Sequence, residues 1–221
     1  MKFGALFDWD GVVIDSSDQH ERSWSMLAEE IDKPLPADHF KRGFGMKNQL
    51  IIPEILAWTD EPQEIERYSL RKEELYREII AREGIEPLPG VKSLLQMLNE
   101  HGVPCAVGSS THRKNIEVIF DAIGLRPYFQ AVITAEDVSR GKPDPEVFLK
   151  SASRIGIPAH HCVVFEDAHV GIEAGLAAGA RVIAVATTHP LAELGQANLA
   201  VDGLEQVSWE CFSGLFDANV N

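Results

Sequence analysis

The stretch Leu6–Val13, with the sequence LFDWDGVV, places Asp8 and Asp10 directly after an apolar run and directly before a glycine. In an extended segment, residues i and i+2 point to the same side, so both carboxylates reach one spot at the end of a strand. Two carboxylates held close together repel, so one keeps a proton that the other gives up. That asymmetry suits a nucleophile beside a general acid/base, and the same pair attracts a hard cation such as Mg²⁺. The plainer alternative is a strand followed by an Asp-Gly turn.

The composition limits the classes of partner. The 221 residues carry a net charge of −14, which argues against nucleic acid and anionic membranes because both need a basic face. No apolar run approaches the roughly 18 residues of a membrane span, and the N-terminus lacks a signal-peptide layout. Cys105, Cys162 and Cys211 form no metal or redox motif. Cys105 and Cys162 lie in apolar surroundings, which predicts buried thiols and a cytoplasmic protein.

Short helical segments alternate with Val- and Ile-rich runs from residue 91 onward. This alternation predicts an α/β fold with a doubly wound, Rossmann-like parallel sheet that helices cover on both faces. The expected strands are Phe3–Asp8, Val103–Val107, Ala131–Thr134, Cys162–Phe165, Arg181–Ala186 and Leu199–Val201. The expected helices between them are Val91–His101, Lys114–Ala122, Pro145–Ile155 and Val170–Ala178.

The segment from residue 16 to residue 85 has a different pattern. Apolar stripes within 24–31 and 65–79 repeat at helical spacing with charges between them, and no strand is evident. We therefore expect a core domain of residues 1–15 and 86–221 and an inserted helical domain of residues 16–85. Two short connections join them, so the insertion can close over a site as a rigid body.

Residues capable of chemistry follow the expected strands. Ligands of parallel α/β sheets bind beyond the carboxyl ends of the strands, so such residues should share one edge. The groups that meet this condition are Asp8 with Asp10, Ser109 with Ser110, Lys142, and Glu166 with Asp167.

Each of these groups also has a purely structural interpretation. Ser109 and Ser110 belong to a run typical of a helix N-cap, Lys142 suits a solvated loop, and Glu166–Asp167 suits an acidic cap. Their convergence favours a site in which Ser109 offers a hydroxyl and backbone N–H groups to a phosphate oxygen and Lys142 balances negative charge. With carboxylates that bind Mg²⁺, this set predicts phosphoryl transfer through an aspartyl-phosphate.

The motifs resemble those of the haloacid dehalogenase (HAD) superfamily. They are DxDGV at Asp8–Val12, GSS at Gly108–Ser110, GKPDPE at Gly141–Glu146 and FEDAHVGIEA at Phe165–Ala174. The insertion resembles the helical C1 cap of the subgroup that contains β-phosphoglucomutase and related sugar phosphatases.

The resemblance implies a role for each core residue. Asp8 would be the nucleophile and a Mg²⁺ ligand, and Asp10 the general acid/base with its backbone carbonyl on Mg²⁺. Asp167 would bind the metal directly, and Glu166 directly or through water. The residues that would hold the transferring phosphoryl group are Ser109, Ser110 and Lys142.

The inserted domain departs partly from the mutase pattern. His20 falls where β-phosphoglucomutase has a histidine that helps to assemble the catalytic site, and Lys72 falls where it has a lysine that contacts the substrate. The alternatives are a surface histidine for His20 and a solvated, salt-bridged helix face for Lys72. Asn48, in the stretch Gly45–Asn48, stands where the mutase has an arginine for the substrate's second phosphate. Lys47 is one place away, and a lysine does not reproduce the two-point grip of an arginine.

The sequence therefore predicts a Mg²⁺-dependent phosphatase acting on a small phosphorylated metabolite such as a sugar phosphate. A β-phosphoglucomutase-type mutase is the alternative built from the same parts. A non-catalytic phospholigand-binding protein is a third possibility, which the presence of both Asp8 and Asp10 disfavours. We expect a cytoplasmic monomer without nucleic-acid or membrane partners.

Overall fold

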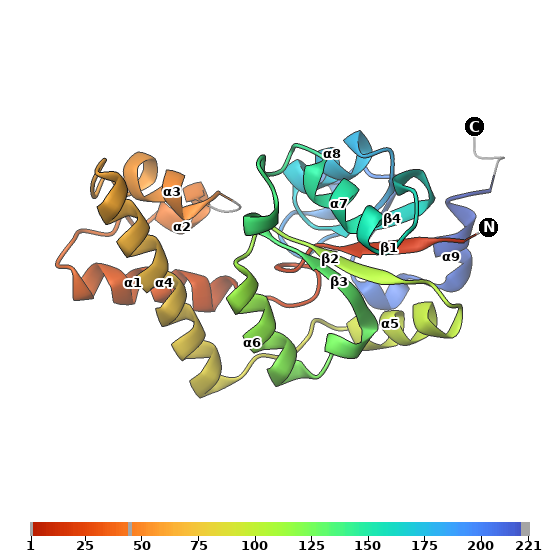
Figure 1. Cartoon of the computed structure of the whole chain (residues 1–221), viewed down its shortest axis with the longest axis horizontal. Helices are drawn as coiled ribbons and strands as arrows, with labels where there is room; N and C mark the ends of the chain where they lie inside the picture. Colours follow the sequence, from red (N-terminus) through yellow and green to blue (C-terminus); the bar gives the residue numbers. More distant parts are fainter. Residues whose placement is uncertain (1, 44–45, 218–221) are drawn as a thin grey trace. The chain divides into compact units, whose positions relative to one another are not determined.

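The chain forms two compact units in the computed structural model, which describes residues 2–43 and 46–217 (Figure 1). The core unit comprises Met1–Asp15 and Glu86–Asn221, and the inserted unit comprises Ser16–Ile85. Among the described residues, no helix combines the length and apolarity needed to cross a membrane.

The core unit is built on a six-stranded sheet in the order β3-β2-β1-β4-β5-β6, and every neighbouring pair is parallel. The strands are β1 (Gly4–Phe7), β2 (Cys105–Gly108), β3 (Phe129–Ile133), β4 (Cys162–Glu166), β5 (Arg181–Val185) and β6 (Leu199–Val201). The predicted α/β class is confirmed. The predicted strands are present with bounds that shift by a residue or two, and the last agrees at both ends.

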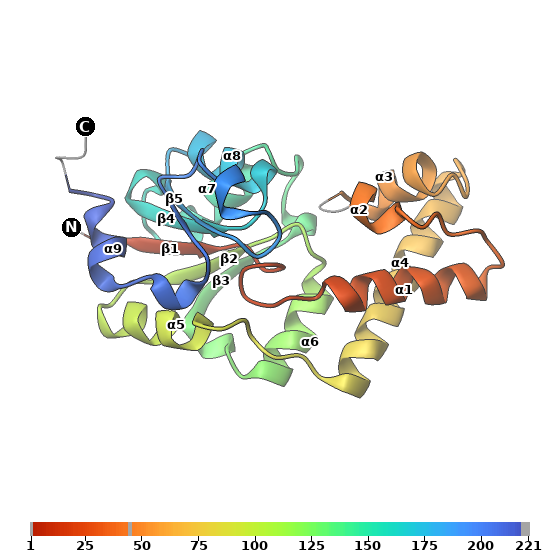
Figure 2. The same cartoon turned by 180° about the vertical axis from the view of Figure 1, so that it is seen from behind.

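Helices cover both faces of this sheet (Figures 1 and 2). The core helices are α5 (Val91–Glu100), α6 (Arg113–Ile123), α7 (Glu146–Arg154), α8 (His169–Ala177) and α9 (Trp209–Gly214). Helices α7 and α8 lie on one face, and α5, α6 and α9 lie on the other. Single 3₁₀ turns occur at Arg126–Tyr128, Ala135–Asp137, Ala159–His161, Leu191–Glu193 and Leu204–Gln206.

The central strand β1 is buried on both sides, because its side chains alternate between two apolar layers. Leu6 packs in a cluster with Phe148 of α7 and Ile172 of α8. Phe7 points to the opposite face and stacks on Phe165 of β4, with 4.6 Å between the ring centroids. A polar group is therefore tolerated only where the strand ends, which is where the first aspartate occurs.

Two of the three cysteines are core residues, as predicted. Cys105 and Cys162 are buried, free thiols, and burial raises the pKa of each to about 12. Cys211 on α9 is exposed.

The inserted unit is helical, and its described residues contain no strand, as predicted. Its elements are α1 (Ser17–Glu30), α2 (His39–Gly43), α3 (Asn48–Leu50), a π-helical turn (Ile51–Ile55) and α4 (Pro62–Glu83). The long helices α1 and α4 pack against each other around an apolar cluster that includes Trp24 and Trp58, whose rings meet edge to face. This unit thus buries a hydrophobic core of its own.

Candidate active site

The carboxyl edge of the sheet carries polar residues from four segments. Asp8 follows β1, Ser109 follows β2, and Glu166 is the last residue of β4. Because β2, β1 and β4 are neighbours in one parallel sheet, their carboxyl ends lie at the same edge. Lys142, from the segment between β3 and α7, reaches two of these groups. The four segments therefore meet, as the sequence predicts.

Lys142 bridges two buried carboxylates. Its Nζ donates to Asp8 Oδ1 at 2.6 Å and to Glu166 Oε1 at 2.5 Å. The side chains of Lys142, Asp8 and Glu166 are only 7%, 12% and 1% exposed. The alternative of a solvated loop lysine is therefore wrong, since a cation this buried requires opposite charges beside it.

Burial and the crowding of carboxyl groups at this edge of the sheet raise the pKa values of two aspartates. Burial raises the pKa of Asp8 to about 7, with Lys142 opposing and Glu166 adding to the increase. Burial together with the charges of Glu166 and Asp8 raises the pKa of Asp167 to about 8. Burial disfavours the charged form of Lys142, but Asp8 and Glu166 outweigh it and raise the pKa of the ammonium group. One lysine thus compensates only part of the charge of three carboxyl groups.

These three carboxyl groups suit a divalent cation. Asp8, Glu166 and Asp167 each offer an oxygen, and the three oxygens lie within 4.8 Å of one another. Oxygen-only, buried, negatively charged donor sets are what Mg²⁺ selects. The residues present therefore fit a magnesium ion. The side chain of Asp10 does not belong to this group.

Two glycines make room for the acidic cluster. Gly11 has φ +81°, and a Cβ there would lie 1.9 Å from Asp167 Oδ2. On α8, a Cβ at Gly171 would lie 1.6 Å from Glu166 Oε1. Both distances are far below any van der Waals contact, so a side chain at either position would displace a carboxylate. The glycine of the DxDGV stretch is thus needed for close approach as well as for the turn.

Asp10 lies at the start of a tight turn and forms an isolated bridge with Ile14, where the turn ends. β1 ends at Phe7, and the backbone then closes a tight loop in which Gly11 N–H donates to Ile14 O at 2.7 Å. The hydroxyl of Thr111 donates to Asp10 Oδ2 and orients this carboxyl group. The pairing of β1 with its neighbouring strands stops at Phe7. The hydrogen bonds of the tight turn therefore give partners to backbone N–H and C=O groups that the sheet no longer pairs.

Ser109 contacts the neighbouring strand and its own loop. Its own backbone N–H donates to Ile133 O at 3.0 Å, so among the backbone N–H groups expected to bind phosphate this one is already used. Its Oγ accepts from Thr111 N–H at 3.0 Å, which leaves the hydroxyl proton as the donor it can offer a ligand. The N-cap of α6 is His112, so Ser109 and the exposed Ser110 do not cap that helix.

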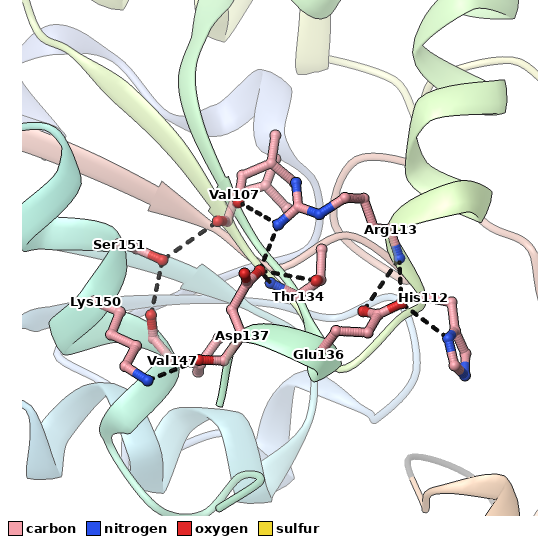
Figure 3. Close-up of polar contacts among 10 residues, drawn as sticks. Val107, His112, Arg113, Thr134, Glu136, Asp137, Val147, Lys150 and Ser151 are labelled. Carbon is pink, nitrogen blue, oxygen red and sulfur yellow. Dashed lines mark hydrogen bonds and ion pairs between the residues drawn. The ribbon is translucent and has the colours of Figure 1, made fainter. Parts of the chain in front are cut away.

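A polar network joins the start of α6 to the turn after β3 (Figure 3). Arg113 Nη2 donates to Asp137 Oδ2 at 2.5 Å, and Thr134 N–H and Oγ1 donate to the same carboxylate. Burial acts to raise the pKa of Asp137, but the hydrogen bonds from Thr134 and the charge of Arg113 outweigh it and lower this pKa below its usual value. At the start of α6, Glu136 accepts from the Arg113 N–H, which fastens this helix to the turn after β3.

Thr188 is a further residue at this edge, and no motif pointed to it. It lies after β5, and its hydroxyl donates to Asp167 Oδ2. Because β5 is the neighbour of β4, the rule that selected Glu166 also applies to the polar residues after β5. Thr188 and Thr111 each orient one aspartate of the site.

The inserted unit holds a buried polar cluster of its own. Lys72 Nζ lies 2.5 Å from His20 Nδ1 and donates to Glu73 Oε1 at 3.0 Å. It also sits 5.5 Å from the ring centroids of both Trp24 and Tyr76. Since the Lys72 side chain is only 3% exposed, the solvated-face alternative for this residue is wrong.

The neighbouring residue, Arg71, makes ion pairs at the surface instead. Its guanidinium contacts Glu30, Glu74 and Glu78 at 2.7–3.2 Å. One position along the helix thus separates a partly exposed cation from a buried one.

Asn48 belongs to the buried polar cluster. Its Nδ2 donates to Glu73 Oε1 at 2.7 Å and to Ser69 Oγ at 3.2 Å. Lys47 is half-buried at the start of α3, and Gly45, the first residue of the stretch compared with the mutase, lies outside the described residues. The position that holds an arginine in the mutase pattern here carries an amide bound to a carboxylate.

The comparison with known families agrees with this arrangement. The model of the family described as "haloacid dehalogenase-like hydrolase" matches residues 4–179, so the chain belongs to this family of hydrolases. The family resemblance and the expectation of an enzyme are confirmed.

Individual relatives share most of the chain. A chloroplastic 5-amino-6-(5-phospho-D-ribitylamino)uracil phosphatase of Arabidopsis thaliana is 37% identical over 93% of this chain, which spans only 55% of that relative's length. Hexitol phosphatase A of Escherichia coli is 34% identical, with 93% of each chain covered. The crystal structure of β-phosphoglucomutase from Clostridium difficile matches with a TM-score of 0.85 and 26% identity over 97% of both chains.

Proposed function

We propose that this protein is a Mg²⁺-dependent phosphatase that hydrolyses a small phosphorylated metabolite, such as a sugar phosphate, through an aspartyl-phosphate. The observation that carries the proposal is the buried Asp8 carboxylate, held by Lys142 at the carboxyl end of β1 beside two further acidic groups. The names of the plant and bacterial phosphatase relatives support the same class of substrate.

Asp8 would act as the nucleophile. One of its carboxylate oxygens attacks phosphorus, and the bond between phosphorus and the ester oxygen breaks. Lys142 holds Asp8 in place and, with the hydroxyl of Ser109, would bind the phosphoryl oxygens. Ser110, next in the same loop, would add a further hydroxyl.

Asp10 would move the proton. It gives a proton to the departing ester oxygen in the first half of the reaction and takes one from water in the second. That water oxygen then attacks phosphorus, the bond to Asp8 breaks, and inorganic phosphate leaves. The hydrogen bond from Thr111 keeps the Asp10 carboxyl group in one orientation during both transfers.

A magnesium ion held by Asp8, Glu166 and Asp167, with the Asp10 backbone carbonyl, would neutralise charge on the transferring group. Without a cation, these carboxylates would repel an incoming phosphate. In the described part of the chain, Lys142 supplies one positive charge to this group of acids.

Hydrolysis is favoured over mutase activity by the inserted unit. A β-phosphoglucomutase-type reaction must hold a bisphosphate, which needs positive charge for the second phosphate. At the relevant position Asn48 donates to Glu73, and the charges of Glu73 and Lys72 compensate each other. Among the described residues, the ion pair of Lys72 with Glu73 therefore has no net positive charge to offer a second phosphate.

The mutase stays the second candidate because of one observation. The pair formed by His20 and Lys72, 2.5 Å apart, matches two positions of the mutase pattern.

A product analysis separates the two activities. The purified protein is incubated with β-glucose 1-phosphate, Mg²⁺ and a trace of glucose 1,6-bisphosphate, and free phosphate and glucose 6-phosphate are read together. A parallel panel contains hexitol phosphates and 5-amino-6-(5-phospho-D-ribitylamino)uracil. We expect free phosphate from at least one substrate, none without Mg²⁺, and no isomerisation. Glucose 6-phosphate without free phosphate would establish the mutase instead, and no product from any substrate would contradict both.

We further propose that the inserted unit acts as a cap whose buried polar cluster contacts the substrate. Replacing Lys72 by Met keeps the packing against Trp24 and Tyr76 but removes the charge. We expect the KM to rise at least about tenfold, because a hydrogen bond to a charged group contributes about 1.5–3 kcal/mol, while the Mg²⁺ concentration for half-maximal rate stays unchanged.

The matched control for this variant is Arg71→Met, which removes the neighbouring, more exposed cation. It should leave the KM unchanged, and a thermal melt of each variant reports whether the unit still folds. Equal KM values for Lys72→Met and the wild type would remove Lys72 from the substrate site. The cytoplasmic location and the monomeric state stay predictions.

A further inference from the structure

A second group of metal-ligating side chains lies outside the acidic cluster. His169 is the first residue of α8, and His189 and Glu193 lie in the segment that follows β5. Each offers one ligand atom, and the three atoms lie within 4.8 Å of one another. His169 Nε2 is 4.0 Å and His189 Nδ1 is 3.9 Å from Glu193 Oε2. The two imidazole rings are 4.4 Å apart between centroids.

From this geometry we propose that His169, His189 and Glu193 form a binding site for a transition-metal ion of the Zn²⁺ class. Two imidazole nitrogens and one carboxylate oxygen are a common three-ligand set for zinc, with water in the fourth position. Tetrahedral zinc sites need ligand atoms slightly closer than those observed, and the Glu193 side chain, which is 58% exposed, can rotate to provide this.

The donor chemistry separates this site from the acidic cluster. Mg²⁺ prefers oxygen ligands only, whereas imidazole nitrogen favours Zn²⁺, Co²⁺, Ni²⁺ and Cu²⁺. The side chains of His169 and His189 are 42% and 31% exposed, so an ion can reach them from solvent and retain a water ligand. A simple ion pair between a protonated histidine and Glu193 is the competing interpretation of this proximity.

The two clusters share the same two segments of chain. Thr188, next to His189, donates to Asp167, which precedes His169 by two residues. The test therefore keeps Mg²⁺ in large excess, so that the acidic cluster does not take up the added zinc. It also uses a Cys211→Ser background, because an exposed thiol would compete for the same ion.

The experiment is a Zn²⁺ titration of the untagged full chain in competition with a chromophoric chelator. We expect one Zn²⁺ per chain in the starting protein. Because each variant removes a ligand, His189→Ala and Glu193→Gln should each weaken binding by at least about tenfold. Titration with Co²⁺ should give visible absorption bands of a low-coordinate site in the starting protein and not in the variants.

The matched control removes a different histidine pair. His160 is exposed and its neighbour His161 is partly exposed, their ring centroids are 4.3 Å apart, and neither belongs to either three-ligand group. The double variant His160→Ala/His161→Ala should bind Zn²⁺ like the starting protein. Absence of Zn²⁺ binding in the starting protein, or equal binding in His189→Ala, would overturn the site in favour of the ion pair.

Discussion

Replacement of Asp8 by asparagine is expected to lower the rate of phosphate release by about 10⁴-fold or more, which is the scale seen when a nucleophile is removed. Asparagine has the same shape but a far weaker nucleophilic oxygen. It retains an oxygen that can accept the hydrogen bond from Lys142, and Lys142 keeps its contact with Glu166. The thermal unfolding midpoint should therefore stay within a few degrees of the wild type.

The control for Asp8→Asn is Asp121→Asn, the same change at an exposed position of α6. Its rate should equal that of the wild type within a factor of about two, since surface substitutions rarely disturb a distant site. The measurement is release of inorganic phosphate from the best substrate of the panel, with mass spectrometry to exclude deamidation back to aspartate. Turnover by Asp8→Asn above a hundredth of the wild-type rate would refute the assignment of Asp8 as the nucleophile.

The strands were predictable because burial on two faces leaves a clear sign in the sequence. β4 and β5 are nearly unbroken runs of apolar residues, and such runs between short helices are typical of strands in a covered parallel sheet. The carboxyl-end rule then places Asp8, Ser109 and Glu166 at one edge without further information.

The hydrogen bonds that orient the site residues were not predictable in the same way. Thr111 and Asp10 are 101 positions apart in the chain, and their contact depends on a tight turn after β1 that local pattern does not reveal. Thr188 follows a strand at the same edge, but a threonine has no special spacing that marks it as a site residue. The rule about strand ends includes Thr188 only when it is applied to every strand.

Lys72 is the residue for which two signals in the sequence conflict. The run Arg71–Glu74 is fully charged, which is typical of a solvated helix face. Yet Lys72 is four residues after Tyr68 and three before Leu75, so helical periodicity puts it on the apolar stripe. The buried contacts of Lys72 with Glu73 and His20 show that periodicity is the better guide at this position.

Replacement of Lys142 by methionine is expected to destabilise the folded protein by about 3–5 kcal/mol, which is the range for removing one partner of a buried ion pair. Lys142 is the cation between Asp8 and Glu166, and without it both carboxylates would be buried beside each other with no positive charge. Lys142 Nζ lies 4.8 Å from the centroid of the Phe148 ring, and methionine fills similar volume beside that ring, so a cavity is not the cause. Urea unfolding without Mg²⁺ measures the change.

Lys150→Met is the matched control, because Lys150 makes an ion pair of equal length in an exposed place. Its Nζ lies 2.6 Å from Glu146 Oε1, the same distance as between Lys142 Nζ and Asp8 Oδ1, but the side chains of Lys150 and Glu146 are 46% and 18% exposed. An ion pair whose lysine is this exposed stabilises the fold little, since water screens its charge. The difference between the two variants therefore measures the effect of burial. Equal losses would mean that water reaches the Asp8 carboxylate freely, and that Lys142 is not needed to keep it buried.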